Sequence, residues 1–434
     1  MIATTIVSIL TFLTLTLSIL FFPSVKIGRC KLGSYWVIAL LGAAILLCLG
    51  QTPLSVIWAG LTQDTEVNPL KILVLFFSMT FLSVFLDEAG FFRLLANRAT
   101  RAAGTDQRRL FILLYLLTAL LTVFTSNDII ILTLTPFICF FCKNAKISPL
   151  PYLVSEFAVA NTWSMMLVIG NPTNIYLATS AGIGFLDYIK VMALPTVAAG
   201  VVEFLLLLLL FRKQLGERME PESDDFKIES KADLAVGVAH LAVCLVFLVI
   251  SGYLRLPMWL ISAVCALSLL LFATLLRLTR KGGPSHVKTA TARLPWQLIP
   301  FVLSMFVIVI CLGDRGISHA LGEFLGNRAC IWTYGASSFF FANLINNIPM
   351  SILFSTLPAG LAAGQYQQAI YASIAGSNIG AFLTPIGALA GIMFTELTDR
   401  YQVDYGFRRF LKYGAIISIP TFAATLALLA LILK

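Results

Sequence analysis

The chain has 434 residues, of which 59% are hydrophobic and only 12% are charged, and its mean hydropathy is +0.91. A soluble domain of this size cannot bury so much apolar surface, so the composition excludes a soluble enzyme, a disordered chain and a secreted disulfide scaffold. The net charge of +9 fits cytoplasmic loops of a membrane protein better than a nucleic-acid partner. We therefore expect a polytopic helical membrane protein.

Apolar runs of about 20 residues mark the expected membrane spans. They lie at 2–22, 34–50, 70–90, 186–212, 233–253, 257–278, 295–314 and 406–433. Two further segments, 108–142 and 330–357, are apolar arms on either side of a polar tip and are predicted to be re-entrant hairpins. Two more, 150–182 and 366–397, are predicted to be helices broken at Gly-Asn-Pro-Thr-Asn and Thr-Pro-Ile-Gly. The first run has no basic start and no cleavage site, so it is expected to be a retained helix.

The basic residues give this layout an orientation. Loops at 23–33, 91–109, 143–149, 212–232, 277–294 and 398–412 fall on one side and hold 24 of the 30 Lys and Arg residues. By the positive-inside rule that side is cytoplasmic, which places both termini outside and the chain in the plasma (inner) membrane. Residues 91–104 alternate apolar and basic positions and are expected to lie along the cytoplasmic interface.

Short polar motifs recur in the same order in the two halves of the chain. Leu86-Asp87-Glu88-Ala89-Gly90 is similar to Leu312-Gly313-Asp314-Arg315-Gly316, and the two hairpin tips and two helix breaks follow in turn. We expect an all-α protein of two inverted repeats, 1–212 and 233–434, joined by a cytoplasmic linker at 213–232. Each repeat would hold five transmembrane helices and one re-entrant hairpin, with broken helices at the midplane, as in secondary transporters.

Irregular backbone survives at membrane depth only inside protein or beside a water-filled cavity. We therefore expect the two tips and two breaks to converge on one polar pocket that binds a solute or ion. Its neutral amides and hydroxyls suit a small neutral or singly charged solute. The residues assigned to it are Ser126, Asn127, Asp128, Gly170, Asn171, Pro172, Thr173, Asn174, Asn346, Asn347, Ser377, Asn378, Thr384, Pro385 and Gly387.

Asp128 is the leading candidate for proton coupling, because an acid in mid-span is costly and needs a proton, a cation or a partner. A helix N-cap is the competing interpretation, and the two are compatible. Glu156 and Glu203 also lie in or near spans, where a buried hydrogen bond is the alternative to function. Asp87 and Glu88 end a helix close to Arg93, which favours a boundary salt bridge.

No metal site and no catalytic centre is predicted. Cys139 and Cys142 share a helix face, but paired thiols are more often small buried residues than ligands of a soft metalloid. The three histidines are far apart, and no ATP-hydrolysing motif is present, so transport would use an ion gradient or an external partner. A passive channel is a remaining alternative that the repeat with broken helices disfavours.

Several motifs together resemble the arsenite/antimonite efflux permeases of the ion transporter superfamily. They are Leu86–Phe92, Asn127-Asp128 with Leu132–Pro136, Pro295-Trp296-Gln297, Asn346–Pro349, Gly376–Gly380 and Leu383–Gly387. The resemblance implies ten crossings with two hairpins, an elevator or rocking motion, and often a homodimer. It further implies arsenite extrusion driven by proton influx, sometimes with a soluble ATPase partner, and no cofactor beyond the coupling ion.

Two positions differ from those permeases. Where they carry acids in Ala-Asp-Thr and Gly-Cys-Asp-Leu-Gly, this chain has amides at Asn161 and Asn378. The break at Gly170–Asn174 is closer to the carboxylate- and sodium-coupled members of the superfamily. Two hypotheses follow: proton-coupled arsenite or antimonite efflux, or a sodium- or proton-coupled carrier of carboxylates or other small anions.

Overall fold

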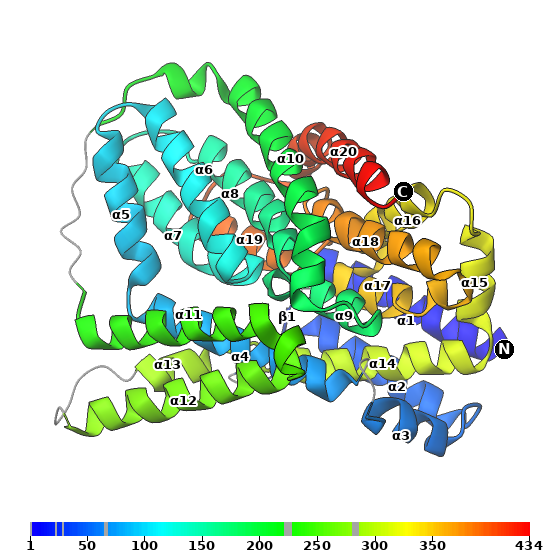
Figure 1. Cartoon of the computed structure of the whole chain (residues 1–434). Coiled ribbons are helices and arrows are strands. Elements are labelled where there is room, and N and C mark those ends of the chain that lie inside the picture. Colours follow the sequence, from blue (N-terminus) through cyan, green and yellow to red (C-terminus); the bar gives the residue numbers. More distant parts are fainter. Residues whose placement is uncertain (1, 22–23, 28–29, 65–67, 221–227, 280–285) are drawn as a thin grey trace.

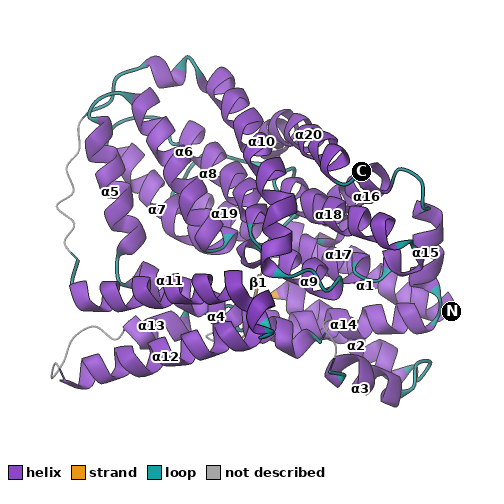
Figure 2. Cartoon of the chain, viewed as in Figure 1, coloured by secondary structure: helices purple, strands orange, loops and turns teal. Residues whose placement is uncertain are grey.

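The computed structural model describes residues 2–21, 24–27, 30–64, 68–220, 228–279 and 286–434. Nearly all of this part of the chain is helical (Figure 2). The expectation of a wholly helical protein is corrected at one place, where β1 (Ser24–Ile27) pairs antiparallel with β2 (Cys30–Gly33). Two four-residue strands connect α1 to α2 and leave the fold class unchanged.

The first half of the described chain contains ten α-helices and two 3-10 turns. They are α1 (Ile2–Phe21), α2 (Ser34–Cys48), α3 (Leu54–Thr62), α4 (Pro69–Glu88), α5 (Phe91–Ala103), α6 (Gln107–Phe124), α7 (Asn127–Asn144), α8 (Leu150–Trp163), η1 (Ser164–Met166), η2 (Val168–Gly170), α9 (Pro172–Ser180) and α10 (Phe185–Phe211).

A short 3-10 turn, η3 (Gln214–Gly216), precedes the second half. The remaining elements are α11 (Lys231–Leu254), α12 (Met258–Thr279), α13 (His286–Ala292), α14 (Leu298–Asp314), α15 (Ile317–Leu325), α16 (Cys330–Ile345), α17 (Asn347–Phe354), η4 (Leu357–Gly360), α18 (Ala363–Gly380), α19 (Leu389–Arg400) and α20 (Phe407–Ile432).

Seven of the described helices are long and apolar enough to cross a membrane: α4, α6, α7, α10, α11, α12 and α20. An eighth candidate is the pair α14 and α15, which is bent by 80°. Both arms of the first predicted hairpin, α6 and α7, have crossing length. The second predicted hairpin has a shorter arm, because α17 contains only 8 residues and rises about 12 Å.

The helices form two layers (Figure 1). In the lower layer α2 packs on α1 and α14, and α12 packs on α4 and α11. In the upper layer α10 packs on α20, α16 on α18, and α7 on α8 and α19. Contacts of α9 with α4, and of α17 with α14, join the two layers.

Helices α5 and α15 run between the layers at opposite ends of the molecule (Figure 1). Each begins directly after a left-handed glycine: Gly90 has φ +83° before α5, and Gly316 has φ +71° before α15. Residues with a Cβ are strained at such φ values, so glycine allows the chain to change direction there. The same order of elements thus occurs twice, from α4 to α10 and from α14 to α20. In each case a long helix, a glycine and a short helix are followed by a two-helix segment, an interrupted helix and a helix that contains proline.

Candidate functional site

Asn378 links the two interrupted helices, although they are some 200 residues apart in the chain. It lies near the end of α18, and its side-chain oxygen accepts hydrogen bonds from Asn171 Nδ2 at 3.1 Å and Ser164 Oγ at 2.9 Å. Its Nδ2 donates to Asn174 Oδ1 at 2.6 Å. All four side chains are fully buried, so these bonds replace the water that the membrane interior does not supply.

The interruption between α8 and α9 is held open by its own sequence. Asn174 Nδ2 donates to the carbonyls of Ser164 and Leu167, and Asn171 caps α9 by accepting from the backbone N–H of Thr173 at 3.1 Å. Pro172 occupies the first helical position of α9, where no N–H is needed. A Cβ at Gly170 would lie 2.1 Å from the Ser164 carbonyl oxygen, so only glycine fits this backbone path.

The first polar tip joins this network through a residue outside the predicted set. Asn127, the first residue of α7, donates from Nδ2 to Asn161 Oδ1 at 3.1 Å. Asn161 lies on α8, one turn before Ser164, whose hydroxyl donates to the Asn161 carbonyl. The tip between α6 and α7 is therefore connected to Asn378 through α8.

The second polar tip binds the second interruption. Asn346 Nδ2 donates to the Ile386 carbonyl at 2.9 Å, and the Asn347 backbone N–H donates to the Gly387 carbonyl at 3.0 Å. Asn343 accepts from both the backbone and the hydroxyl of Thr384. Pro385 lies in the same loop, and a Cβ at Gly387 would lie 2.7 Å from the Ala381 carbonyl oxygen.

Three buried polar atoms of the predicted residues have no hydrogen-bond partner among the described residues. They are Asn127 Oδ1, Thr173 Oγ1 and Ser377 Oγ. A buried polar atom without a partner costs about 1–3 kcal/mol, and such exceptions are rare in folded proteins. These three atoms are therefore unsatisfied positions inside the polar region of the protein.

Asp128 lies outside the amide network and instead faces a separate cavity. This inner cavity has a volume of about 270 Å³ between α2, α4 and α14 of the lower layer and α7 and α19 of the upper layer. Its wall includes Tyr35, Ser126, Asp128, Gln297 and Glu396. No described residue forms a hydrogen bond or an ion pair with the Asp128 carboxyl. Of the predicted site residues, Ser126 and Asp128 thus line this cavity, whereas the others lie in the amide network or in the second tip and break.

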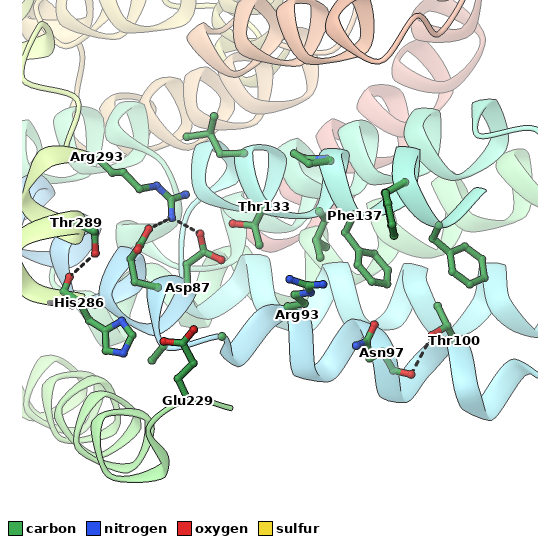
Figure 3. Close-up of a pocket in the computed structure, with 18 of the residues that line it drawn as sticks. Asp87, Arg93, Asn97, Thr100, Thr133, Phe137, Glu229, His286, Thr289 and Arg293 are labelled. Carbon is green, nitrogen blue, oxygen red and sulfur yellow. Dashed lines mark hydrogen bonds and ion pairs between the residues drawn. The ribbon is translucent and has the colours of Figure 1, made fainter. Parts of the chain in front are cut away.

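A larger outer cavity of about 650 Å³ meets the inner one. The two share Leu132 and Arg293 in their walls, and the outer cavity extends along α5 and α13 (Figure 3). Its lining comes from the ends of α4 and α7, from α5 and from α13. The two cavities therefore adjoin at Leu132 and Arg293, with α5 and α13 beside the outer one and Asp128 beside the inner one.

The boundary salt bridge expected at the end of α4 is present, and it includes an arginine that is distant in the sequence. Asp87 and Glu88 both contact Arg293, at 2.7 and 2.5 Å, whereas the sequence spacing points to Arg93. Arg293 lies in the segment between α13 and α14, which packs near the end of α4. Arg93 is nearer in the sequence. Arg293 lies 205 positions after Glu88, and folding brings it into contact with both acids.

Two further acids are buried inside the upper layer. Both oxygens of Glu156 accept from the Thr135 hydroxyl, at 2.9 and 3.1 Å. Glu203, with no exposed surface, pairs one oxygen with the Thr162 hydroxyl, and its other oxygen has no partner in the described chain. No described cation pairs with either acid, and the described partner of each is a threonine hydroxyl, as in the buried hydrogen bond offered as the alternative to function.

Sequence inspection misses Ser164, Asn343, Gln297 and Arg293 as site residues. Asn343 lies three positions before Asn346, and Ser164 lies six positions before Gly170; this nearness to the predicted polar runs is the only signal they offer. Cys139 and Cys142 are buried, and no group of three or more His, Cys, Asp or Glu side chains in the described part of the chain is arranged to hold a metal ion.

Known proteins resemble this chain over most of its length. The family model described as citrate transporter matches residues 31–376. The arsenical pump membrane protein of Escherichia coli K12 is 28% identical over 410 residues, which cover 91% of this chain and 92% of that protein. The arsenical pump membrane protein of Yersinia enterocolitica is 27% identical over 374 residues, covering 82% and 85%.

The fold also has a counterpart among solved structures. The crystal structure of the Alcanivorax borkumensis YdaH transporter aligns with a TM-score of 0.55 at 15% identity, over 99% of this chain and 97% of that one. These relatives are membrane transporters and not enzymes, and the apolar helices and buried polar breaks of this chain match that role. The chain is therefore a multi-pass membrane protein and a secondary transporter, and it belongs to the citrate transporter family.

Proposed function

We propose that this transporter extrudes arsenite or antimonite and couples extrusion to proton influx. The observation that carries the proposal is the position of Asp128, an acid without a described partner in the wall of the inner cavity. A lone carboxylate is costly in such a wall, so it favours a proton in one conformation and releases it where water reaches it. The similarity to arsenical pumps along 91% of the chain supports the same solute class.

The chemistry of the polar residues fits an uncharged hydroxo acid. Arsenous acid is neutral near pH 7 and presents three hydroxyl groups. Amide and hydroxyl side chains both donate and accept hydrogen bonds, so they can satisfy such a solute without a balancing charge. Among the unpaired atoms, Asn127 Oδ1 can accept a hydrogen bond, and the hydroxyls of Thr173 and Ser377 can both donate and accept.

The two halves of the chain suggest how the solute would cross. We propose that 1–212 and 233–434 are inverted repeats joined by the linker 213–232, each with one re-entrant hairpin and one broken helix. In this scheme the upper layer carries the tips and breaks and moves against the lower layer, with α5 and α15 as the connections. The repeated element order and the glycines before α5 and α15 support it.

Orientation follows from the basic segments. The outer cavity is lined by Arg93, His286, Arg293 and Tyr401, which belong to segments predicted to be cytoplasmic. Both chain termini lie at one end of the molecule, and α5 and α13 lie towards the other (Figure 1). We infer that the route to Asp128 opens to the cytoplasm of the inner membrane, with both termini outside, as an exporter loading its solute requires.

The second candidate is a sodium- or proton-coupled carrier of carboxylates. The family description favours it, and the oxygens of Asn127 and Thr173 are ligand types that hard cations accept. A multiply charged carboxylate also needs cationic partners. The one Arg or Lys side chain in the described wall of the inner cavity is Arg293, which two acids already hold. The arsenite proposal requires no such partner.

Metalloid accumulation tests the proposal directly. The protein is expressed in a bacterium that lacks its own arsenite exporter, its membrane level is verified, and cell arsenic is measured after arsenite loading. We expect less arsenic than in the empty control. Asp128→Asn should abolish that difference, whereas Asp187→Asn, a matched change at an exposed residue paired with Lys190, should not.

Unchanged arsenic in cells with verified protein would refute the arsenite proposal. Uptake of a small carboxylate into proteoliposomes, measured with and without a sodium or pH gradient, would then test the second candidate. Full extrusion by Asp128→Asn would leave arsenite transport intact and refute the role of the carboxyl.

A further inference from the structure

Arg293 lies where the outer and inner cavities meet. Of the arginines and lysines that the structure describes, it is the one that lines both cavities. A solute that moves from α5 towards Asp128 therefore passes its guanidinium group. Figure 3 shows Arg293 in direct contact with Asp87, with Thr133 beside them and Arg93 further along α5.

A free arginine at such a junction would attract anions. Its planar guanidinium binds carboxylates through two parallel hydrogen bonds, which makes arginine a preferred residue for recognising them. In this chain the same nitrogen, Nη1, contacts Asp87 Oδ2 at 2.7 Å and Glu88 Oε1 at 2.5 Å. The position of Arg293 suits anion binding, but Asp87 and Glu88 already pair with its positive charge.

The cluster contains more negative than positive charge. Two carboxylates face one guanidinium at the junction, so acidic groups outnumber the basic group there. The Asp87 side chain is 10% exposed and that of Glu88 19%, so water screens the cluster only in part. Burial lowers the pKa of Arg293, but the carboxylates of Asp87 and Glu88 outweigh that effect and raise it, so the guanidinium stays charged and paired.

The other charged groups do not reverse this balance. Glu396 and Asp128 line the inner cavity, and Glu229 lines the outer one. Arg93 and His286 line the outer cavity but not the inner one. An anion would thus lose favourable contacts as it moves inwards from Arg93, whereas an uncharged solute would not.

We propose that Asp87 and Glu88 set the charge selectivity of the transporter by holding Arg293, so that the junction rejects anions and admits uncharged hydroxo acids. The inference rests on the proposed function, since it names the charge state of the solute that the same route carries. A site discriminates by what it repels as well as by what it binds. Removing the two acids should therefore convert the junction into an anion site.

The test measures citrate binding to the purified full-length protein by titration calorimetry. The wild type should show no measurable binding at the junction. Asp87→Asn with Glu88→Gln removes both negative charges from Arg293 while keeping the size of both side chains, and citrate should then bind measurably, at least about tenfold tighter than the weakest binding that the titration detects. Adding Arg293→Gln to that double variant should remove the gain.

A control variant and a milder variant accompany the double variant in the citrate titration. Asp187→Asn removes an acid from Lys190 in an exposed pair outside both cavities, and it should leave citrate binding unchanged. Glu88→Gln alone keeps the better-buried Asp87 contact and should give an intermediate gain. It serves as the test variant if the double variant does not fold.

The outcomes separate this inference from the proposed function. If freeing Arg293 gives no citrate binding, the cluster only links α4 to the segment between α13 and α14, and the inference is overturned even if wild-type cells extrude arsenite. If the wild type itself binds citrate through Arg293, the inference is also overturned. Arsenic accumulation, measured separately, then decides whether arsenite transport survives.

Discussion

Asn378 on α18 donates a hydrogen bond to Asn174 on α9 over 2.6 Å, across 204 positions of sequence. Both side chains are fully buried, and Asn378 also accepts from Asn171 and Ser164. The two interrupted helices are therefore joined by side chains and not only by apolar packing. This link is the most direct structural connection between the two polar breaks.

Replacing Asn378 by alanine should destabilise the protein and abolish transport. The change leaves Asn171, Asn174 and Ser164 without a shared partner, and each unpaired buried group costs about 1–3 kcal/mol. We expect a lower midpoint of thermal unfolding in detergent, with Asn327→Ala, at an exposed position, as the control. A midpoint equal to the wild type would mean that the network adds nothing to stability.

Gly170→Ala should prevent the interruption between α8 and α9 from forming. The new methyl group would lie 2.1 Å from the Ser164 carbonyl oxygen, which belongs to the backbone and cannot move aside cheaply. Gly313→Ala is the matched control, because a Cβ there meets nothing within 4 Å and alanine favours the helix. Membrane yield and thermal unfolding should fall for the first variant only, and equal losses in both would contradict this explanation.

Replacing Asn346 by glycine and by alanine should lower the thermal stability of the protein to different extents. Its φ of +72° and ψ of +153° are strained for any residue with a Cβ, and its side chain binds the Ile386 carbonyl and the Ile348 N–H. Glycine loses both hydrogen bonds but relieves the strain, whereas alanine loses the bonds and keeps the strain. Thermal unfolding should therefore give the order wild type, Asn346→Gly, Asn346→Ala, and a reversed order of the two variants would show that strain is negligible.

Glu203→Gln should leave the fold intact. Glu203 is fully buried, and no described cation balances its charge, so a neutral amide of the same shape satisfies the Thr162 hydroxyl at lower desolvation cost. Thr162→Val, which removes the hydroxyl from the acid, should lower stability by about 1–3 kcal/mol. Unfolding of Glu203→Gln but not of Thr162→Val would contradict this explanation and show that the charged form of Glu203 stabilises the fold.

Local patterns predict the helices well. The hydrophobic runs give α4 and α10 to within two residues, and the alternation of apolar and basic positions gives α5. These elements follow from periodicity and from caps such as Asn68, whose Oδ1 accepts from the N–H groups of Leu70 and Lys71. The same patterns miss α3, because nine residues carry too little periodicity, and the ribbon of β1 and β2, because four-residue strands carry almost none.

Contacts between distant residues limit what sequence alone predicts at the site. Polar residues in apolar segments identify Asn171, Asn174 and Asn378 individually, since such residues are costly in lipid. Their partners depend on how α9 and α18 pack, and no local spacing encodes that packing. The pairing of Arg293 with Asp87 escapes sequence inspection for the same reason, because Arg293 reaches the acid through the packing of the segment before α14 against α4.

The link between Asn174 and Asn378 also has a consequence for synthesis. At about 5–20 residues per second, the ribosome needs about 10–40 s to reach Asn378 after it has made Asn174. During that interval the amides of α9 lie in the membrane without the side chain that later satisfies them. The first half must therefore be held by lipid headgroups, water or the insertion machinery until α18 arrives, and truncation before Asn378 should yield a rapidly degraded fragment.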